Sequence, residues 1–254
     1  MRRVPRFFVD AGAVHGDVVH IGGESAIHLA RSLRARAGES IVVVEAGTIE
    51  HGVVLTDVGA TQVSGRIEWS RPATGESRLR IHLLQAIPAR GFDDTIEALA
   101  IAGADTIHPV ITERGVVRAD AGPSRLKAGR WEAIAREAAQ LAGRGRAPRI
   151  APPMPLAAVL AALPARCPIL ACVADERAIP IETFTVGDTA TVACMIGPEG
   201  GLGARDLLEL NAHDATTVHL GPRIVPSRLA GLVAVSLLLA RNGDLDSAPE
   251  PAPR

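Results

Sequence analysis

Two short loops rich in glycine and proline contain the residues best suited to holding a ligand. Residues 197–201, Gly-Pro-Glu-Gly-Gly, follow the apolar run 191–196, and residues 221–223, Gly-Pro-Arg, follow a second short run, 217–220. Glycine lacks a Cβ, so such loops tolerate positive φ and bring backbone N–H and C=O groups against a ligand. The short apolar runs are typical of buried parallel strands. We expect both loops at the carboxyl edge of one sheet, where open α/β sheets bind ligands.

The chemistry of these loops excludes two common nucleotide-binding motifs. No Gly-Lys-Ser/Thr follows either loop, as a phosphate-binding P-loop requires, and no Gly-x-Gly-x-x-Gly follows an early strand. Glu199 is the charged side chain of the first loop. A tight βα turn without a ligand is the alternative for a single loop of this kind, and the second glycine break makes that alternative weaker.

The composition limits how the protein can interact with nucleic acid. Its 254 residues are enough for a sizeable core and two domains. Aromatic residues make up 2% of the chain and Tyr is absent, so base stacking on exposed rings is not expected to dominate RNA binding. The formal net charge is −1, so any RNA-binding surface has to be local.

The cysteines and the chain start predict a soluble cytoplasmic protein. Cys167, Cys172 and Cys194 lie in apolar surroundings without paired ligand spacing, which favours small buried hydrophobic residues over metal ligands or nucleophiles. The first residues, 1–6, do not resemble a secretory signal, and no apolar run is long enough to span a bilayer.

The elements around the loops divide into two predicted domains. Residues 1–72 alternate short β-type runs with turns, which predicts a small barrel interrupted by a helix from Ser25 to Arg36 that ends at Gly38. Residues 73–78 are rich in turn formers and predict a linker. Residues 79–245 form the second domain, and 246–254, rich in proline, are expected to be disordered.

The second domain has the pattern of an α/β fold with a parallel sheet. The run 79–86 predicts a strand, 95–102 a helix closed by Gly103, and 106–111 the next strand, which together make a β-α-β unit. A helix over 131–141 places Ile134, Ala138 and Leu141 on one apolar stripe. Further predictions are helices at 152–163 and 229–240 and a strand at 168–173.

Two groups of arginines could contact a phosphate backbone. Arg31, Arg34 and Arg36 lie close together around the end of the first helix, and Arg6 is a further candidate in the same domain. Residues 125–146 form the densest basic region, which includes Arg130 and Arg144. Solvated helix faces and arginines that complement a helix dipole are the structural alternatives.

The two glycine loops carry a family resemblance. Residues 196–201, Ile-Gly-Pro-Glu-Gly-Gly, and 220–224, Leu-Gly-Pro-Arg-Ile, resemble the C-terminal signature of the RsmE family. That family methylates N3 of a uridine in 16S ribosomal RNA and belongs to the SPOUT class, whose C-terminal trefoil knot forms the S-adenosylmethionine site. The resemblance implies a SPOUT-like parallel sheet with a trefoil knot. The implied cofactor-binding residues are Ile196, Gly197, Pro198, Glu199, Gly200, Gly201, Leu220, Gly221, Ile224, Val225 and Ala230.

The resemblance also covers the first domain and the basic residues. Residues 6–9, Arg-Phe-Phe-Val, with His28, Leu33 and Gly38 match a PUA-like RNA-binding barrel. The implied partners are ribosomal RNA in the small subunit and a second copy of the chain, whose interface would involve the apolar helix 229–239. The candidate RNA-binding residues are Arg6, Arg31, Arg34, Arg114, Arg130 and Arg144.

The chain departs from the family pattern where chemistry is expected. The family's Leu-Arg-Thr-Glu-Thr-Ala is Val-Pro-Ser-Arg-Leu-Ala at 225–230, so its Arg and Glu are absent, and the family Lys near the first strand is Ala89. A cation near uracil O2 or O4 would stabilise the anion that forms when N3 loses its proton. Arg223 and Arg228 are the candidates for this catalytic role. A non-catalytic RNA-binding relative and a nucleotide or small-molecule enzyme on the same scaffold stay open as alternatives.

Overall fold

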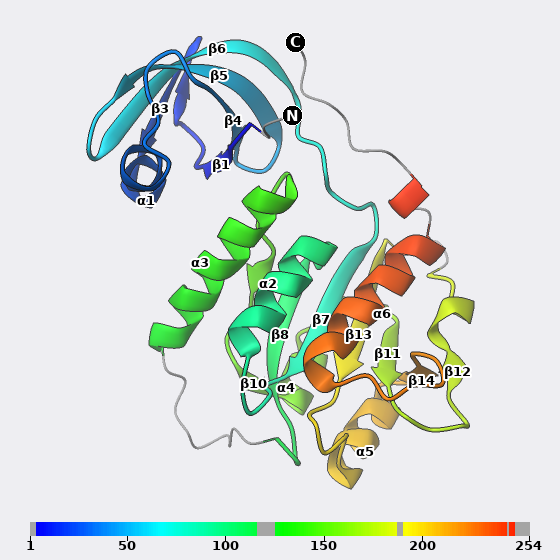
Figure 1. Ribbon diagram of the computed structural model, residues 1–254. Helices are drawn as coiled ribbons and strands as arrows, with labels where there is room; N and C mark the ends of the chain where they lie inside the picture. Colours follow the sequence, from blue (N-terminus) through cyan, green and yellow to red (C-terminus); the bar gives the residue numbers. More distant parts are fainter. Residues whose placement is uncertain (1–3, 116–124, 187–189, 243, 247–254) are drawn as a thin grey trace. The chain divides into compact units, whose positions relative to one another are not determined.

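The computed structural model describes residues 4–115, 125–186, 190–242 and 244–246, and it divides into two compact units. Figure 1 shows the strands of the smaller unit in blue to cyan and the strands and helices of the larger unit in turquoise to red. The boundary after Glu76 falls inside the predicted linker 73–78. Residues 139–147 cluster with the smaller unit although they lie far along the chain, which the sequence patterns did not predict. Of the predicted tail, Asp246 is described and residues 247–254 lie outside the described residues.

The smaller unit is built on a six-stranded sheet in the order β1-β4-β5-β6-β3-β2. β1 pairs in parallel with β4, and the other neighbours are antiparallel. The strands are β1 (Arg6–Val9), β2 (Val14–His15), β3 (Val18–Gly22), β4 (Ser40–Glu45), β5 (Ile49–Val58) and β6 (Gln62–Pro72). The alternation of buried and exposed positions in β3 and β6 matches a sheet with one face on a core and one in solvent.

The helix predicted from Ser25 to Arg36 is shorter and less regular than expected. It consists of α1 (Gly23–Ile27) followed by one π-helical turn, η1 (His28–Ser32). Arg34 then takes a φ of +51°, which the helix cannot continue through and which few non-glycine residues adopt. The helix therefore ends at Ser32 and not at the predicted Arg36, about one turn early.

Two buried ion-pair networks hold the smaller unit together. Glu50 is fully buried and pairs with Arg6, at 2.7 Å, and with Arg71. Glu76 accepts hydrogen bonds from Nε and Nη2 of Arg144 at 3.1 and 2.8 Å. It also accepts the backbone N–H groups of Gly145 and Arg146, which explains why the segment 139–147 stays with this unit. Such buried pairs are costly to break, because removing one partner leaves an uncompensated charge.

The larger unit contains an all-parallel sheet in the order β10-β8-β7-β13-β11-β14-β12, with β9 pairing to β8. Its strands are β7 (Arg80–Ala86), β8 (Thr106–Ile111), β9 (Arg149–Ile150), β10 (Met154–Pro155), β11 (Ile169–Cys172), β12 (Ile179–Pro180), β13 (Thr191–Ile196) and β14 (Thr216–His219). The predicted α/β class with a parallel sheet is confirmed for this unit. The central strands β7 and β13 are buried along most of their length because helices cover both of their faces, and apolar residues fill most of their buried positions.

Helices cover both faces of this sheet (Figure 1). One layer contains α2 (Phe92–Ala102), α6 (Ser227–Arg241) and the first part of α3 (Arg125–Ala142), and it packs on residues such as Leu83 and Cys194. The opposite layer contains α4 (Leu156–Ala161) and α5 (Ala204–Ala212), which pack on residues such as Leu84 and Met195. Successive residues of a strand therefore pack into hydrophobic cores on opposite faces of the sheet. Gly103 ends α2 at a φ of +106°, as predicted for a helix stop.

Two details of the predicted helices need correction. Leu141 was placed on the buried stripe of α3, yet it is 64% exposed, and the buried positions are Trp131, Ala135, Ala138 and Ala139. The Trp131 ring contacts Phe92 edge-on, and its indole N–H donates to Asp93, which rotates the buried stripe toward α2. The helix predicted at 152–163 is limited to 156–161, because Met154–Pro155 pairs with β8 as β10.

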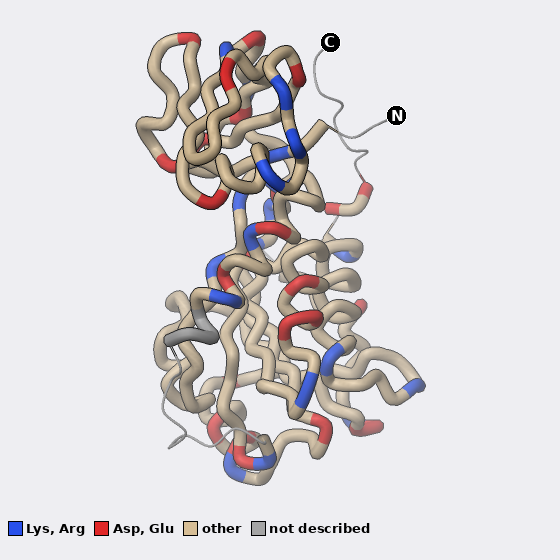
Figure 2. Tube along the Cα trace, turned by 60° about the vertical axis from the view of Figure 1, so that its left-hand side comes forward, with Lys and Arg blue, Asp and Glu red and all other residues tan. Residues whose placement is uncertain are grey.

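Charged residues are interspersed along the described trace of both units, acidic among basic (Figure 2). This distribution agrees with the near-neutral net charge of −1. Among the described residues, every helix is too short or too polar to traverse a lipid bilayer.

Candidate functional site

The two glycine loops lie at the same edge of the parallel sheet. β13 ends at Ile196 and runs into residues 197–203, while β14 ends at His219 and runs into residues 220–226. β11, which lies between β13 and β14, ends at Cys172 and contributes a third loop, 173–177. Because all three strands are parallel, their carboxyl ends meet at one edge. A pocket of about 720 Å³ opens there between the loops.

Most residues predicted to bind the cofactor line this pocket. From the first loop these are Ile196, Gly197, Pro198, Glu199 and Gly201; from the second region they are Leu220, Gly221, Ile224, Val225 and Ala230. Gly200 is the exception, and its carbonyl accepts a hydrogen bond from Nη1 of Arg114 at 3.1 Å. Of the two arginines predicted to be catalytic, Arg223 lines the pocket and Arg228 does not.

Further lining residues were missed by the sequence analysis. They come mainly from the loop after β11 and from the strand ends, and comprise Cys172, Val173, Ala174, Asp175, Arg177, Leu202, Leu207, Thr217, His219, Pro226 and Ser227. The signal that could have found the β11 loop is the polar run 175–177 directly after a predicted strand. The position of β11 between β13 and β14 could not be predicted, because the local sequence pattern does not determine the order of strands in a sheet.

Ser227 joins the two glycine loops. Its hydroxyl, on the first turn of α6, donates to the carbonyl of Gly197 at 2.6 Å, and the residue is 7% exposed. Nε2 of the fully buried Gln85 lies 3.4 Å from the same hydroxyl. Gly231 leaves room for Gln85, since a Cβ there would stand 2.8 Å from Oε1 of Gln85. The side chains below the pocket therefore fix the distance between its two walls.

His219 shapes the second loop. The backbone N–H of Gly221 donates a hydrogen bond to Nδ1 of His219 at 3.1 Å. Gly221 takes a φ of +100°, which favours glycine. The turn after β14 is thus closed by a side chain that also lines the pocket.

The predicted RNA-binding arginines separate into two groups. Arg6 pairs with the buried Glu50, and Arg144, which is 4% exposed, pairs with the partly buried Glu76. Their contact with phosphates stays a prediction. Arg31 and Arg34 are exposed in the smaller unit. Arg114 is exposed in the larger unit beside the first glycine loop, and Arg130 is 69% exposed and pairs with Asp93 at 2.5 Å.

Two cysteines and two histidines of the larger unit are packed in pairs. Sγ of Cys172 lies 3.5 Å from Sγ of Cys194, and this hydrogen bond, together with burial, raises the pKa of Cys172. Nδ1 of His82 lies 3.1 Å from Nε2 of His108 with the rings stacked. Burial, then His82 and Arg149, lower the pKa of His108 from 6.5 to about 4. Among the described residues, no group of three or more His, Cys, Asp or Glu side chains could hold a metal ion.

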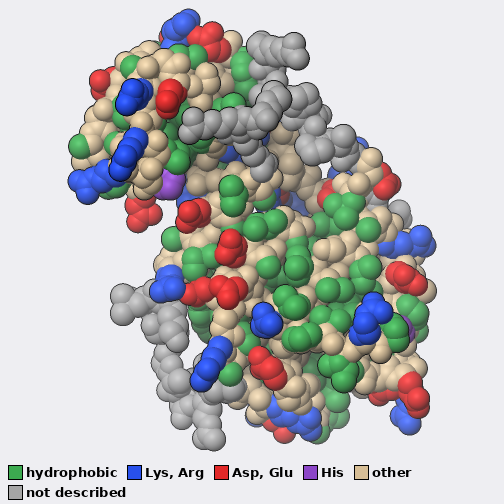
Figure 3. Space-filling view, viewed as in Figure 1, with side chains coloured by type: hydrophobic (Ala, Val, Ile, Leu, Met, Phe, Trp, Pro, Cys, Tyr) green, Lys and Arg blue, Asp and Glu red, His purple; other side chains and the backbone are tan. Residues whose placement is uncertain are grey.

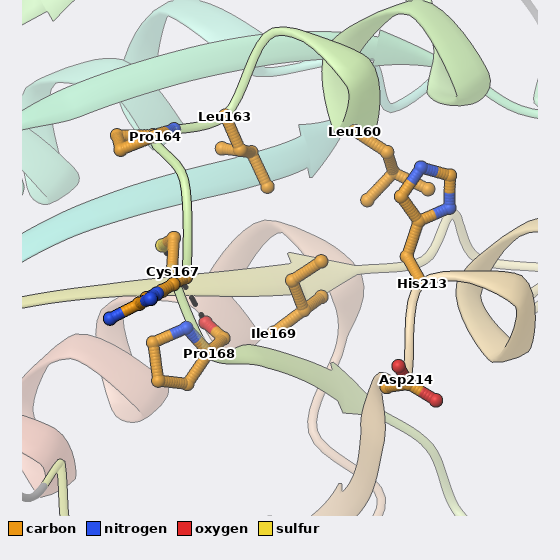
Figure 4. A pocket seen from close by; sticks show the side chains of 9 residues that line it. Leu160, Leu163, Pro164, Cys167, Pro168, Ile169, His213 and Asp214 are labelled. Atoms are coloured by element: carbon orange, nitrogen blue, oxygen red, sulfur yellow. Dashed lines mark hydrogen bonds between the residues drawn. The ribbon is translucent and has the colours of Figure 1, made fainter.

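A smaller pocket of about 350 Å³ lies at the opposite end of β11 (Figure 4). Leu160, Leu163 and Ile169 contribute apolar side chains, and His213 and Asp214 reach it from the turn after α5. The dashed line in Figure 4 marks a hydrogen bond that Sγ of Cys167 donates to the carbonyl of Pro168 at 3.7 Å. His213 and Asp214 are exposed, so this pocket offers less for ligand recognition than the loop pocket.

The fold and the pocket together place this protein in a class. It is an α/β protein with a parallel sheet, and its pocket lies at the carboxyl edge, where such sheets bind small molecules. Residues 75–239 match the RNA methyltransferase domain family, and the chain belongs to that family.

Its relatives are similar over nearly the full length. The ribosomal RNA small subunit methyltransferase E of Mycobacterium bovis is 28% identical over 238 residues, covering 90% of this chain and 88% of the relative. The protein of the same name from Bacillus subtilis is 26% identical, covering 86% and 88%. A crystal structure of this methyltransferase from Neisseria gonorrhoeae, bound to S-adenosyl methionine, superposes with a TM-score of 0.83 at 26% identity, covering 94% and 98%.

Proposed function

We propose that this protein transfers a methyl group from S-adenosylmethionine to N3 of a uridine in the 16S RNA of the small ribosomal subunit. The observation that carries the proposal is the pocket formed by the two glycine loops, in a chain that belongs to the RNA methyltransferase domain family. Full-length similarity to proteins named ribosomal RNA small subunit methyltransferase E supports the choice of substrate. A ribosomal substrate would place the protein in the cytoplasm.

The residues of the pocket fit S-adenosylmethionine. A volume of about 720 Å³ lies within the range of small-molecule sites. Ile196, Leu202 and Val225 offer apolar surface for an adenine ring, while the backbone groups of the glycine loops supply donors and acceptors. Asp175 and Glu199 are carboxylates suited to the cofactor's hydroxyl and ammonium groups. The bound cofactor would supply an electrophilic methyl group on a sulfonium.

The chain's own contribution to the reaction is positioning and electrostatics. Methyl transfer is an in-line displacement, so the acceptor nitrogen must be held on the axis of the breaking bond. The N3 proton of uridine has to leave, and negative charge then develops on O2 and O4. Arg223, which lines the pocket, supplies the cation for this charge, in place of the family arginine that Pro226 replaces. Ser227 and Gln85 hold the loops that carry it.

We further propose that the larger unit contains the SPOUT trefoil knot and that the smaller one is a PUA-like RNA-binding barrel. The strand order supports the knot: the chain leaves β14, between β11 and β12, and returns as α6 to pack on α2 and β7. The six-stranded, mostly antiparallel sheet supports the second assignment. A crystal structure in which residues 220–226 pass outside the preceding loops would contradict the knot.

We propose a homodimer whose interface includes α6. Figure 3 shows hydrophobic side chains gathered over the face that carries α2 and α6. Ile224 is 90% exposed and Leu229 39% exposed, and the outer side of α6 also carries the half-buried apolar residues Leu232, Val233 and Leu237. Apolar residues gathered on the outer side of a helix are expected to be covered by another surface.

The direct test is methylation of small ribosomal subunits from a strain that lacks its own enzyme, using a tritiated methyl donor and mass spectrometry of the nucleosides. The proposal predicts one methyl group per subunit, recovered as 3-methyluridine. Label at another nucleotide would change the substrate assignment. A wild-type protein that binds both cofactor and RNA but transfers no label would instead support the non-catalytic alternative.

A further inference from the structure

Helix α5, whose first turn adjoins the cofactor pocket, begins without a capping side chain of its own. Gly203 occupies the N-cap position, where Ser, Thr, Asp or Asn would ordinarily accept one of the free N–H groups of the first turn. The position of this helix start affects the shape of the pocket, because Leu202 immediately before it and Leu207 within the helix both line the pocket.

The missing cap is supplied by a residue 92 positions away in the sequence. Oε2 of Glu113, in the loop after β8, accepts a hydrogen bond from the backbone N–H of Arg205 at 2.9 Å. Arg205 is the second residue of α5, which is the N–H that an N-cap side chain would accept. A Cβ on Gly203 would stand 2.1 Å from that same Oε2 and 2.5 Å from Cδ. The carboxylate of Glu113 thus occupies the space of the absent N-cap side chain.

The contact is reciprocal. Asp206, the third residue of α5, is 5% exposed and accepts the backbone N–H of Gly203 at 3.0 Å. Its two carboxylate oxygens also accept the backbone N–H of Glu113, each at 3.2 Å. The helix therefore caps the β8 loop while the β8 loop caps the helix, and the next residue, Arg114, holds the carbonyl of Gly200.

We infer that Glu113 is a positioning residue for the cofactor pocket. It acts by capping the N-terminus of α5 from a separate segment of the chain. Glycine is required at position 203, because a side chain there would occupy the space of the Glu113 carboxylate. The first glycine loop is then held at both ends: Ser227 binds the carbonyl of Gly197, and the segment 113–114 binds at Gly200 and Arg205. This inference rests on the proposed function only for the identity of the ligand.

The inference predicts a rescue that an ordinary surface contact would not show. Glu113→Ala removes the cap and should weaken S-adenosylmethionine binding about fivefold, the effect of losing one N-cap. Gly203→Ser in the wild-type background should also weaken binding, because its Cβ collides with Glu113. In the double variant the serine has room, and the φ of −77° and ψ of 171° at this position suit an N-cap serine. Its hydroxyl should restore the cap within the helix.

The experiment compares wild type, the two single variants and the double variant by calorimetric titration with S-adenosylmethionine and by thermal unfolding. Glu113→Gln, which keeps an acceptor oxygen, should stay close to wild type, and Glu97→Ala on α2 serves as the control for loss of an exposed carboxylate. Turnover at saturating cofactor should change little in every variant, since the cap sets affinity. A double variant no better than the poorer single variant in both measurements would overturn the inference. Failure of wild type to bind the cofactor would count against the proposed function, while the melting comparison would still decide the cap.

Discussion

Arginine 223 is the side chain on which the proposed chemistry depends most. It lines the loop pocket, whereas Arg228 is exposed on the first turn of α6 and its backbone carbonyl accepts from Thr95 at 3.5 Å. We therefore expect Arg223→Ala to lower the single-turnover rate of methyl transfer about a hundredfold with little change in cofactor affinity. Arg228→Ala is the matched control and should remain active.

The measurement is rapid-quench methylation of the small subunit under excess enzyme, with calorimetry for the cofactor. If Arg228→Ala is the inactive variant instead, the cation over the uracil comes from α6 and the pocket assignment of Arg223 is wrong. If Arg223→Ala and Arg228→Ala both methylate at the wild-type rate, neither arginine stabilises the negative charge on the uracil oxygens.

The buried histidine pair should make stability depend on pH. The pKa of His108 falls from 6.5 to about 4, chiefly because of burial, so the folded protein resists a proton that the unfolded chain accepts. Between these values the unfolded state binds more protons, and stability is lost as the pH falls from 6.5 toward 4. At pH 5 the loss should be about 2 kcal/mol relative to pH 7.5.

Urea unfolding at the two pH values tests this expectation in wild type and in His108→Gln. The variant cannot titrate at this position and should lose less stability on acidification. An identical pH dependence of the two proteins would show that the pair contributes nothing measurable to it.

At the scale of elements, the site depends on how the start of α6 is tied to the loop after β13. The hydroxyl of Ser227 spans that gap at 2.6 Å from the carbonyl of Gly197. Ser227→Ala leaves this partly buried carbonyl without its donor, at a cost of about 1–3 kcal/mol. We expect cofactor affinity to fall about tenfold with the sheet intact, which calorimetry and circular dichroism would measure. Ser227→Thr keeps the hydroxyl and should bind nearly as wild type does; unchanged affinity in the alanine variant would refute the tie.

At the scale of the whole molecule, the proposed dimer predicts that exposed apolar residues near α6 contribute to association. Ile224→Glu and Leu229→Glu each place a charge on the surface proposed to be covered, which should weaken association at least tenfold. Leu208→Glu on α5 is the control, since Leu208 is 70% exposed on the opposite face of the sheet. Sedimentation equilibrium would measure the dimer constant. Dimers of unchanged affinity in both test variants would exclude this surface.

RNA binding should depend on the exposed arginines among the predicted ones. Arg34→Ala should weaken binding to ribosomal RNA and reduce the slope of log K against log salt by about one. Arg66→Ala, at an exposed arginine of β6 paired with Glu68, is the matched control within the same unit. Filter binding over a series of salt concentrations measures both. Equal slopes for Arg34→Ala and wild type would show that Arg34 is a solvated charge.

The sequence by itself determined the local structure around the site. Its apolar runs, the stop at Gly103 and the β-α-β spacing predicted the parallel sheet, because a buried strand and a capped helix are written in consecutive residues. Its two glycine loops identified the pocket walls for the same reason. The glycine signature also led to the family that residues 75–239 confirm.

Only the tertiary structure decided which distant residues meet. It placed β11 between β13 and β14, which added Asp175 and Arg177 to the pocket. It buried Arg144 against Glu76 and Arg6 against Glu50, although a sequence shows the charge of an arginine and not its partner. It also set Glu113 over Gly203, so that a helix without a capping residue gains one from another strand's loop. Contacts between segments far apart in the chain depend on strand order and packing, which local periodicity does not encode.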